Sequence, residues 1–233
     1  MGIKERHERD RDAVHRAILD AARELFVSEG YNNVSIRKIA ERIEYSPAAI
    51  YSYFPSKDDI FYALAEEGFR LLGTPSDAET AEQLARLPAL ERLRDRFWRL
   101  YDFSRQHPQY FALMFVDRSV PRICREYERF AFARENKGRL IAAIQQCIDE
   151  GIFPATVQPH VASRVLMMGL LGVAVMRLSD RFAPAEDADR LAEDVLAVTL
   201  AGLEAGVVLR STSPTDCPFD APQADASAPT PRS

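Results

Sequence analysis

The sequence predicts an all-α fold in which a small N-terminal helical domain precedes a larger helical domain. In almost every segment of the 233 residues, apolar side chains recur with the 3.6-residue period of a helix, and no segment shows convincing strand alternation. Prolines stand at or near the start of four expected helices, where the missing N–H costs nothing. The chain is also long enough to carry a small domain on a larger one.

The first two helices are expected to precede residue 44. Apolar residues at helical spacing mark one face of the first helix: Val14, Ile18, Ala21, Ala22, Leu25 and Phe26. Gly30 stands where that helix needs a left-handed C-cap. The second helix fits residues 35–43, with Ser35 as its N-cap.

A third and very short helix is expected from Pro47 to about Tyr53. Ser46 is a suitable N-cap, and Pro47 occupies the first helical position. Pro55 ends this helix, and a fourth helix follows over residues 57–72. The remaining helices are expected over 78–87, 88–106, 108–116, 121–150, 159–178 and 185–209.

These elements divide the chain into three expected parts. Residues 1–56 would form a three-helix domain, and residues 57–210 a larger helical domain. Residues 211–233 consist largely of Ser, Thr, Pro, Ala and Asp, which cannot bury a core, so we expect a disordered tail.

Composition and terminal sequence favour a cytoplasmic protein. The formal net charge is −5, so any site for a polyanion must be a local patch. The three cysteines form no CxxC pair and no even framework, which is typical of reduced thiols in the cytosol. The N-terminus lacks the apolar segment of a signal peptide. The longest apolar run, Val165–Met176, is short for a bilayer, so no membrane partner is expected.

The sequence carries no recognisable catalytic or cofactor motif. It has no nucleophile elbow, phosphate-binding loop, metal-spaced histidine cluster or dinucleotide-binding glycines. The four histidines, His7, His15, His107 and His160, are scattered. We therefore expect a protein that is not an enzyme and has no cofactor and no metal.

The second and third helices, joined by a short turn, predict a helix-turn-helix unit. In such a unit the second helix enters the DNA major groove. Here its outer face would present small side chains, which allow the backbone to approach the groove closely. Residues 31–57 also hold four basic and two acidic residues. Each basic residue alone has an ordinary alternative as a solvated charge, and Tyr51 and Tyr53 could equally pack in the core.

Residues 18–64 resemble the N-terminal domain of the TetR-type (tetracycline-repressor-like) regulators. The motifs that carry the resemblance are Ser35 at the start of the second helix, Ile39-Ala40 within it, Tyr45-Ser46 at the turn, Tyr51-Ser52-Tyr53-Phe54 and Lys57. One departure is Ile43-Glu44-Tyr45, where the family usually has Ala-Gly-Val. Glu44 would then hold a left-handed backbone at a cost of about 1 kcal/mol.

The resemblance implies roles for individual residues. Ser35, Tyr53 and Lys57 would contact phosphates, and Arg37 a guanine edge or a phosphate. Tyr51 would pack on the sugar-phosphate or a thymine methyl, while Ala48 and Ala49 offer only apolar contacts. The candidate DNA-binding residues are Ser35, Arg37, Ser46, Pro47, Ala48, Ala49, Tyr51, Ser52, Tyr53 and Lys57.

The aromatic stretch Phe97–Phe115 is a candidate wall for an apolar ligand cavity, with His107, Arg118 or Arg122 as polar anchors. The alternative for each of these residues is plain core packing. The candidate ligand-binding residues are Trp98, Tyr101, Tyr110, Phe111, Met114, Tyr127, Met167, Met168 and Leu171.

The last two helices, about 159–178 and 185–209, are apolar on too many faces for lone surface helices. Two from each chain would form a four-helix bundle in a homodimer. Gly169 and Gly172 would allow the close approach of backbones. The alternative is that both helices are buried within one chain, but the family resemblance favours the dimer.

These observations predict a homodimeric, ligand-responsive transcriptional regulator. It would act as a repressor on a near-palindromic double-stranded DNA operator and be released by an unknown small, mainly apolar ligand. Two alternatives remain: an enzyme that turns over the pocket ligand, and a helical interaction module without operator binding. Glu44 and the net charge favour the second of these.

Overall fold

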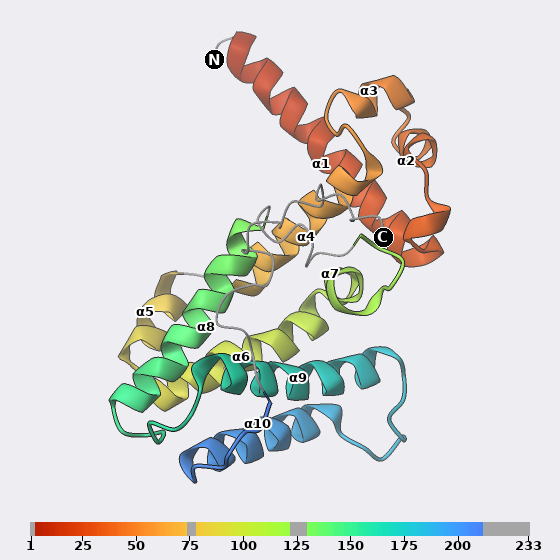
Figure 1. Ribbon diagram of the computed structural model, residues 1–233. Helices are drawn as coiled ribbons and strands as arrows, with labels where there is room; N and C mark the ends of the chain where they lie inside the picture. The colour runs from red at the N-terminus through yellow and green to blue at the C-terminus, as the bar shows by residue number, and fades with distance from the viewer. Residues whose placement is uncertain (1–2, 74–77, 122–129, 212–233) are drawn as a thin grey trace, which may run out of the picture.

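The computed structural model describes residues 3–73, 78–121 and 130–211, and every regular element in these ranges is helical, which confirms the all-α class (Figure 1). The elements are α1 (Ile3–Glu29), η1 (Tyr31–Asn33), α2 (Ile36–Arg42), α3 (Pro47–Tyr51), α4 (Lys57–Gly73), α5 (Ala78–Arg86), α6 (Ala89–Gln106), α7 (Pro108–Phe111), η2 (Ala112–Val116), α8 (Ala131–Asp149), α9 (Pro159–Leu178) and α10 (Ala188–Glu204).

Helices α1 to α3 form a small head around the apolar face that the sequence predicts. Phe26 of α1, Ile39 of α2 and Ile50 of α3 are almost completely buried. Both predicted N-caps are present: the Ser35 hydroxyl accepts a hydrogen bond from the Lys38 N–H at 3.2 Å, and Ser46 caps α3 in the same way. These caps satisfy N–H groups that short helices cannot pair internally.

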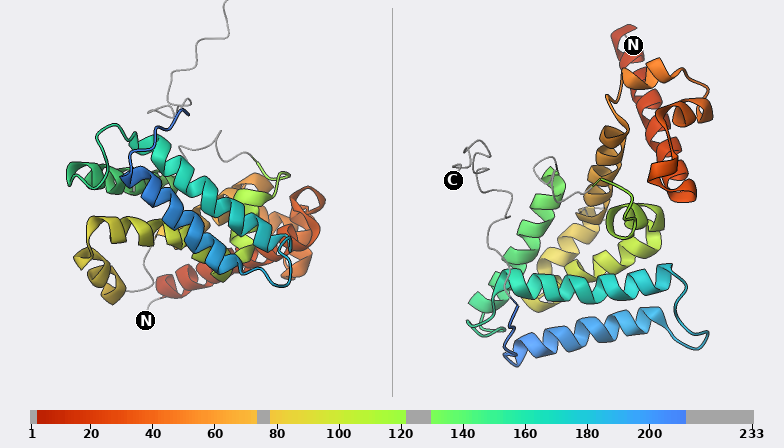
Figure 2. Two further views of the ribbon diagram at one scale, coloured as in Figure 1. Left: turned by 90° about the horizontal axis from the view of Figure 1, so that it is seen from below. Right: turned by 45° about the vertical axis from the view of Figure 1, so that its right-hand side comes forward.

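The long helix α4 runs from the head into a larger body (Figure 1). It packs against α1 in the head and against α8 and α6 in the body. Within the body α6, α8 and α9 pack on one another, and α10 packs mainly on α9. The α9–α10 pair lies at the end of the molecule farthest from the head (Figure 2).

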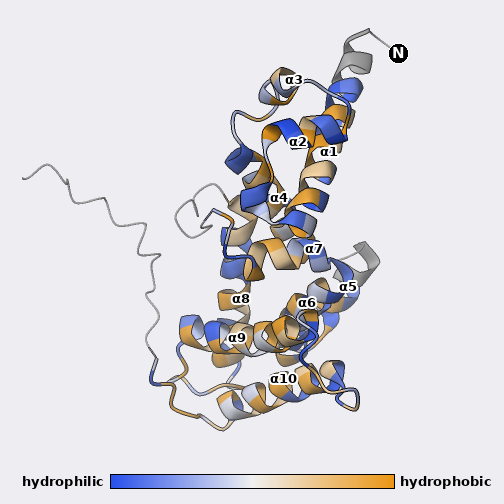
Figure 3. Cartoon of the chain, turned by 90° about the vertical axis from the view of Figure 1, so that its right-hand side faces the viewer, coloured by the Kyte–Doolittle hydropathy of each residue, from blue (hydrophilic) through white to orange (hydrophobic). Residues whose placement is uncertain are grey.

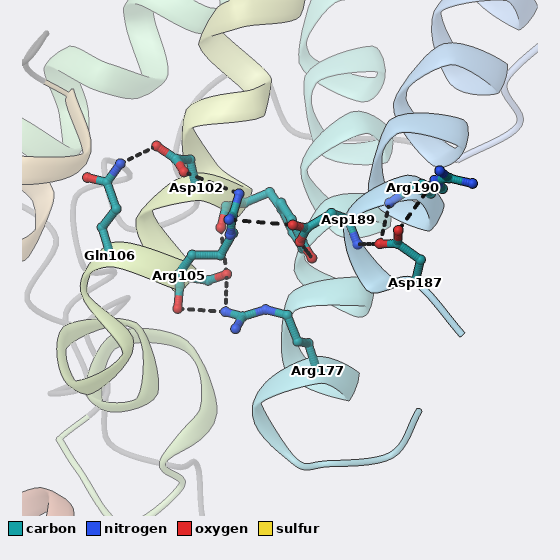
Figure 4. A network of polar contacts seen from close by, with 9 residues as sticks. Asp102, Arg105, Gln106, Arg177, Asp187, Asp189 and Arg190 are labelled. Atoms are coloured by element: carbon teal, nitrogen blue, oxygen red, sulfur yellow. Dashed lines mark hydrogen bonds and ion pairs between the residues drawn. The ribbon is translucent and has the colours of Figure 1, made fainter. Parts of the chain in front are cut away.

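A polar network holds α10 against α6 and α9 (Figure 4). The Tyr101 hydroxyl donates to Asp189 at 2.7 Å, and Arg105 pairs with the same carboxylate at 3.5 Å. Arg177 donates to the backbone oxygen of Ser104 at 2.8 Å. These hydrogen bonds satisfy polar atoms between the helices and so fix how the helices face one another.

The predicted continuous helix over 121–150 is wrong in its first part. Phe130 is non-helical, with φ −102° and ψ 80°, and α8 begins only at Ala131. Residues 122–129 lie outside the described residues. Phe130 is buried against the rings of Tyr62 and Phe69, with centroids 5.8 Å and 5.7 Å away. Apolar residues at helical spacing indicate which residues are buried. Phe130 is buried as this pattern predicts, but it lies outside a helix.

Three other expected helices also end or divide differently from the prediction. The third helix stops at Tyr51, and the segment 108–116 divides into α7 and a π-helical turn, η2. The last helix ends at Glu204, and Gly206 follows with φ 74°. Gly30 has a positive φ, 81°, as expected, but its ψ of 144° lies outside the left-handed helical conformation predicted for it.

Helix α9 is long and apolar enough, by length and composition alone, to cross a membrane. This corrects the argument that its apolar run is too short. Its inward residues Leu166, Leu170 and Ala174 are buried, and it packs against α6, α8 and α10. The apolar composition therefore has an explanation within the fold as that of a core helix.

Cys147 is a buried free thiol, and burial followed by the charge of Glu150 raises its pKa to about 11. Cys124 and Cys217 lie outside the described residues, so reduced thiols at those positions stay a prediction.

Candidate nucleic-acid interface and cavity

The outer face of α3 is exposed and carries small side chains, as the sequence predicts. Helix α3 lies at the end of the head far from α9 and α10 (Figure 3). Pro47, Ala48 and Ser52 are exposed, and Ala49 is half-buried. Tyr51 is 55 % exposed, which excludes a core role for it. Because the buried Ile50 anchors the helix from behind, this surface is held firmly while remaining open to a partner.

The guanidinium of Arg37 is available beside this face. Its side chain is 81 % exposed and pairs with Glu41 on the same helix, at 3.0 Å. Exposed pairs of this kind contribute little free energy, so the guanidinium can exchange this partner for a phosphate or a base at small cost.

Tyr53 is half-buried, and the Arg11 guanidinium lies 5.9 Å from its ring centroid. The contact brings a basic side chain of α1 next to the end of α3, which adds to the local positive charge.

Lys57 points inward, toward the turn between α1 and α2. Its ammonium donates to the backbone oxygens of Tyr31 at 2.8 Å and Val34 at 3.0 Å. It also lies 4.0 Å from the centroid of the Tyr31 ring. Burial lowers the pKa of Lys57. Two of its three donors are thus already used within the head, and its phosphate contact stays a prediction.

Glu44 adopts the left-handed backbone expected at the turn, with φ 61°. Its side chain is exposed immediately before α3. Glu44 therefore places an exposed acidic residue two positions before Ser46, the N-cap of α3.

The body contains a cavity of about 900 Å³ between α4, α6, α8 and α9, with α5 at its edge. Of the predicted ligand-binding residues, Met114 and Met167 line it. Ligand cavities in proteins have volumes of roughly 300–1,000 Å³, so this volume suits a small molecule.

The other predicted ligand-binding residues that the structure describes do not line this cavity. Tyr101 is buried toward α10, the Tyr110 hydroxyl accepts a hydrogen bond from Arg23 at 2.8 Å, and Phe111 is in the core. Trp98 and Leu171 are half-buried, and Met168 is exposed. Tyr127 and the proposed anchor Arg122 lie outside the described residues, and the anchors His107 and Arg118 are not among the lining residues.

Sequence reasoning missed the basic residues of the cavity: Arg92, Arg96, Arg99, Lys137, Arg139 and Arg164. A signal was present for three of them, because positions 92, 96 and 99 follow the i, i+4, i+7 spacing of one helix face. The same face carries Phe97 and Leu100, which also line the cavity.

Two family models match this chain. Residues 18–64 match the model described as "Bacterial regulatory proteins, tetR family". Residues 98–199 match the model described as "Tetracyclin repressor-like, C-terminal domain". Together the two matches cover more than half of the chain, with one falling on the head and α4 and the other on the body.

Curated relatives are similar over a part of the chain. The HTH-type transcriptional repressor Rv1474c of Mycobacterium tuberculosis is 42 % identical over 55 residues, which is 24 % of this chain and 29 % of that protein. The HTH-type transcriptional repressor AcnR of Corynebacterium diphtheriae is 33 % identical over 78 residues, 34 % of this chain and 37 % of that protein. The alignments thus span about a third of these relatives.

Solved structures are similar over most of the chain. The fatty acid degradation regulator FadR from Bacillus halodurans is 17 % identical with a TM-score of 0.65, covering 81 % of this chain and 95 % of that one. FadR from Bacillus subtilis, solved in complex with stearoyl-CoA, is 18 % identical with a TM-score of 0.65, covering 80 % and 98 %. At these identities the likeness shows the shared fold.

Proposed function

Because the chain belongs to the TetR family of bacterial regulatory proteins, we propose that it is a cytoplasmic DNA-binding transcriptional repressor. The observation that carries this proposal is the exposed, small-residue face of α3, with the exposed Arg37 beside it. Such a face permits close approach to the floor of the major groove. Few of these side chains can distinguish bases by hydrogen bonding, so DNA shape would contribute to the choice of operator.

We propose that the active form is a homodimer joined through α9 and α10. Apolar side chains on this pair remain exposed in the single chain: Met168, Met176, Leu191 and Val198. Large apolar side chains exposed on one helix pair are what the partner in a protein–protein interface would cover. Two copies joined in this way would place two α3 helices on half-sites about 34–36 Å apart.

Helix α4 connects the cavity to the head, so we propose that it transmits the effect of a bound ligand to the DNA-binding surface. Its C-terminal end supplies Phe69, Leu72 and Gly73 to the cavity. Its N-terminal residue, Lys57, is bonded to the turn that precedes α2. A ligand that prefers one position of α4 therefore also prefers one placement of the head, and DNA is released if that placement does not fit the operator.

The test is binding of the full-length chain to duplex DNA from upstream of its own gene and to a scrambled duplex, at several salt concentrations. We expect selective binding that weakens as salt rises. Arg37→Ala should weaken operator binding by about 1–3 kcal/mol. Arg86→Ala is the matched control, because Arg86 also forms an exposed pair with a glutamate one helical turn away.

Equal affinity for both duplexes, or loss of binding in Arg86→Ala as large as in Arg37→Ala, would contradict the proposal. Failure to bind any duplex would support the second candidate, an interaction module without operator binding. The observation that favours this alternative is the exposed carboxylate of Glu44 beside α3.

A further inference from the structure

The cavity has one apolar part and one strongly cationic part. Its apolar walls include residues of α4, α6, α9 and η2: Phe69, Phe97, Leu100, Met114, Phe115 and Met167. Six further lining residues, defined here as the cationic wall, are Arg92, Arg96, Arg99, Lys137, Arg139 and Arg164. Among the described lining residues the single carboxylate is Asp95. A neutral ligand would leave this charge uncompensated, and a cationic ligand would be repelled.

Asp95 does not neutralise the cationic wall. It pairs at 2.8 Å with Arg99, one helical turn away. Arg139 pairs with Glu135, and Arg92 donates to a backbone oxygen. Within the described part of the chain, neither Arg96 nor Arg164 has an ion-pair partner.

The arginines at this wall destabilise one another. Arg96 is exposed at the edge of the cavity, but partial burial of its guanidinium lowers its pKa, and the nearby charges of Arg139, Arg99 and Arg92 lower it further, in that order. The direction means that the neighbouring positive charges disfavour the cationic form of Arg96. An anion bound there would offset part of this penalty, because it supplies negative charge beside these arginines.

His160, also a lining residue, adds an unused polar atom. Its Nδ1 is buried and has no hydrogen-bond partner among the described residues. A buried ring nitrogen without a partner costs free energy unless a ligand or a water satisfies it.

We propose that the cavity binds an amphipathic anion whose hydrocarbon chain packs on the apolar walls and whose carboxylate or phosphate head is held by Arg96 and its neighbours in the cationic wall. This inference deepens the ligand response proposed above and rests on it. Guanidinium groups bind both head types by paired, charge-assisted hydrogen bonds. Two sources share this chemistry, a free fatty acid and its thioester with a phosphorylated carrier.

The experiment is isothermal titration of the full-length chain, without DNA, with dodecanoate, lauroyl-CoA, dodecanol and free coenzyme A, all below their micellar concentrations. We expect one or both acyl anions to bind at least tenfold more tightly than dodecanol, since a charge-assisted hydrogen bond contributes about 1.5–3 kcal/mol. Tighter binding of dodecanoate would assign a carboxylate head, and tighter binding of lauroyl-CoA a phosphate head. Equal binding of dodecanol, or of free coenzyme A, or no binding at all, would overturn the proposal.

Variants of α6 test the two halves of the ligand separately. Arg96→Gln should lower acyl-anion affinity about tenfold or more while leaving dodecanol binding unchanged. Arg96→Lys should restore most of the affinity. Arg94→Gln is the control, because Arg94 is exposed on the same helix and does not line the cavity.

A series of fatty acids tests the apolar half of the ligand. Across octanoate, decanoate and dodecanoate, each added methylene should raise the affinity about fourfold. An affinity that does not depend on chain length would also overturn the proposal.

A separate measurement distinguishes this inference from the proposed function. The ligand that binds best is added to the complex of the chain with its upstream DNA. Release of the DNA would support both proposals. Binding of the anion without release would support the ligand class and contradict the ligand response, whereas DNA release by dodecanol alone would contradict the ligand class.

Discussion

Glu44 shows how a single residue strains the turn of the helix-turn-helix unit. Its φ of 61° lies in the left-handed region, which disfavours side chains with a Cβ. The family resemblance places a glycine at this position, so the strain was expected from the sequence. The same residue puts a carboxylate beside the surface proposed to face phosphates.

Glu44→Gly should therefore raise both stability and DNA affinity. The strain removed is about 1–2 kcal/mol, and the added unfolded-state entropy of glycine is about 0.5–1 kcal/mol, which leaves a net gain of up to about 1.5 kcal/mol. Urea unfolding measures the stability, and titration with operator duplex measures the affinity.

Asp180→Gly is the matched control for this prediction. Asp180 also has a positive φ, 51°, but it follows α9 at the other end of the molecule. Its substitution should raise stability similarly and leave DNA affinity unchanged. If the two variants affect DNA binding equally, the effect is not local to the turn.

At the scale of elements, the Met114 side chain of η2 packs directly on the backbone of α4 at Gly68. A Cβ added at Gly68 would lie 2.3 Å from the Sδ atom of Met114. Met114 also lines the cavity, so this contact joins the cavity wall to the helix that leads to the head. Movement of Met114 is thus coupled to the position of α4.

Gly68→Ala should destabilise the fold by about 1–3 kcal/mol, because the extra methyl forces Met114 or the backbone to move. Gly138→Ala, within α8, has open space around its Cβ and should instead stabilise by about 0.5–1 kcal/mol. Urea unfolding of the two variants compares the same substitution in crowded and open surroundings.

A double-mutant cycle tests whether Met114 is the cause. Met114→Ala alone should cost about 2–5 kcal/mol. Combined with Gly68→Ala, the total loss should be smaller than the sum, since the smaller side chain leaves room for the added methyl. Additive losses would show that the clash lies elsewhere.

At the scale of the whole molecule, the head and the α9–α10 pair stand at opposite ends (Figure 2). Gly169 lies where α9 and α10 meet within the chain, because its Cβ would come 2.7 Å from Val195. Gly172 has nothing within 4 Å and faces open space. Gly169, one of the two glycines predicted to allow close approach in the dimer, therefore lies instead in the contact between α9 and α10 of one chain.

Val198→Asp should dissociate the proposed dimer. Val198 is 73 % exposed in the single chain, so a charge there costs little in the monomer but is expensive once the partner covers it. Light scattering coupled to size exclusion should show a monomer, and operator affinity should fall because only one half-site is then held.

Val27→Asp is the control for the dimer prediction. Val27 is also exposed, on α1 in the head. This variant should remain a dimer. A Val198→Asp protein that stays dimeric at micromolar concentration would contradict the proposed interface.

The sequence determined the features that depend on neighbours within a few residues. The Ser35 and Ser46 caps, the positive φ of Gly30 and Glu44, and the brevity of α3 follow from local backbone chemistry. Helical periodicity also predicted most of the buried residues of the head, because one face of an amphipathic helix must be covered.

Tertiary structure decided which buried face meets which partner. Lys57 turns inward to two backbone oxygens, and Phe97 faces the cavity while Trp98 and Tyr101 do not. The cationic wall gathers residues of α6, α8 and α9 that are far apart in the chain. Periodicity reveals that a face is buried but carries no information about what lies opposite, because a cavity is the space left between helices once they have packed.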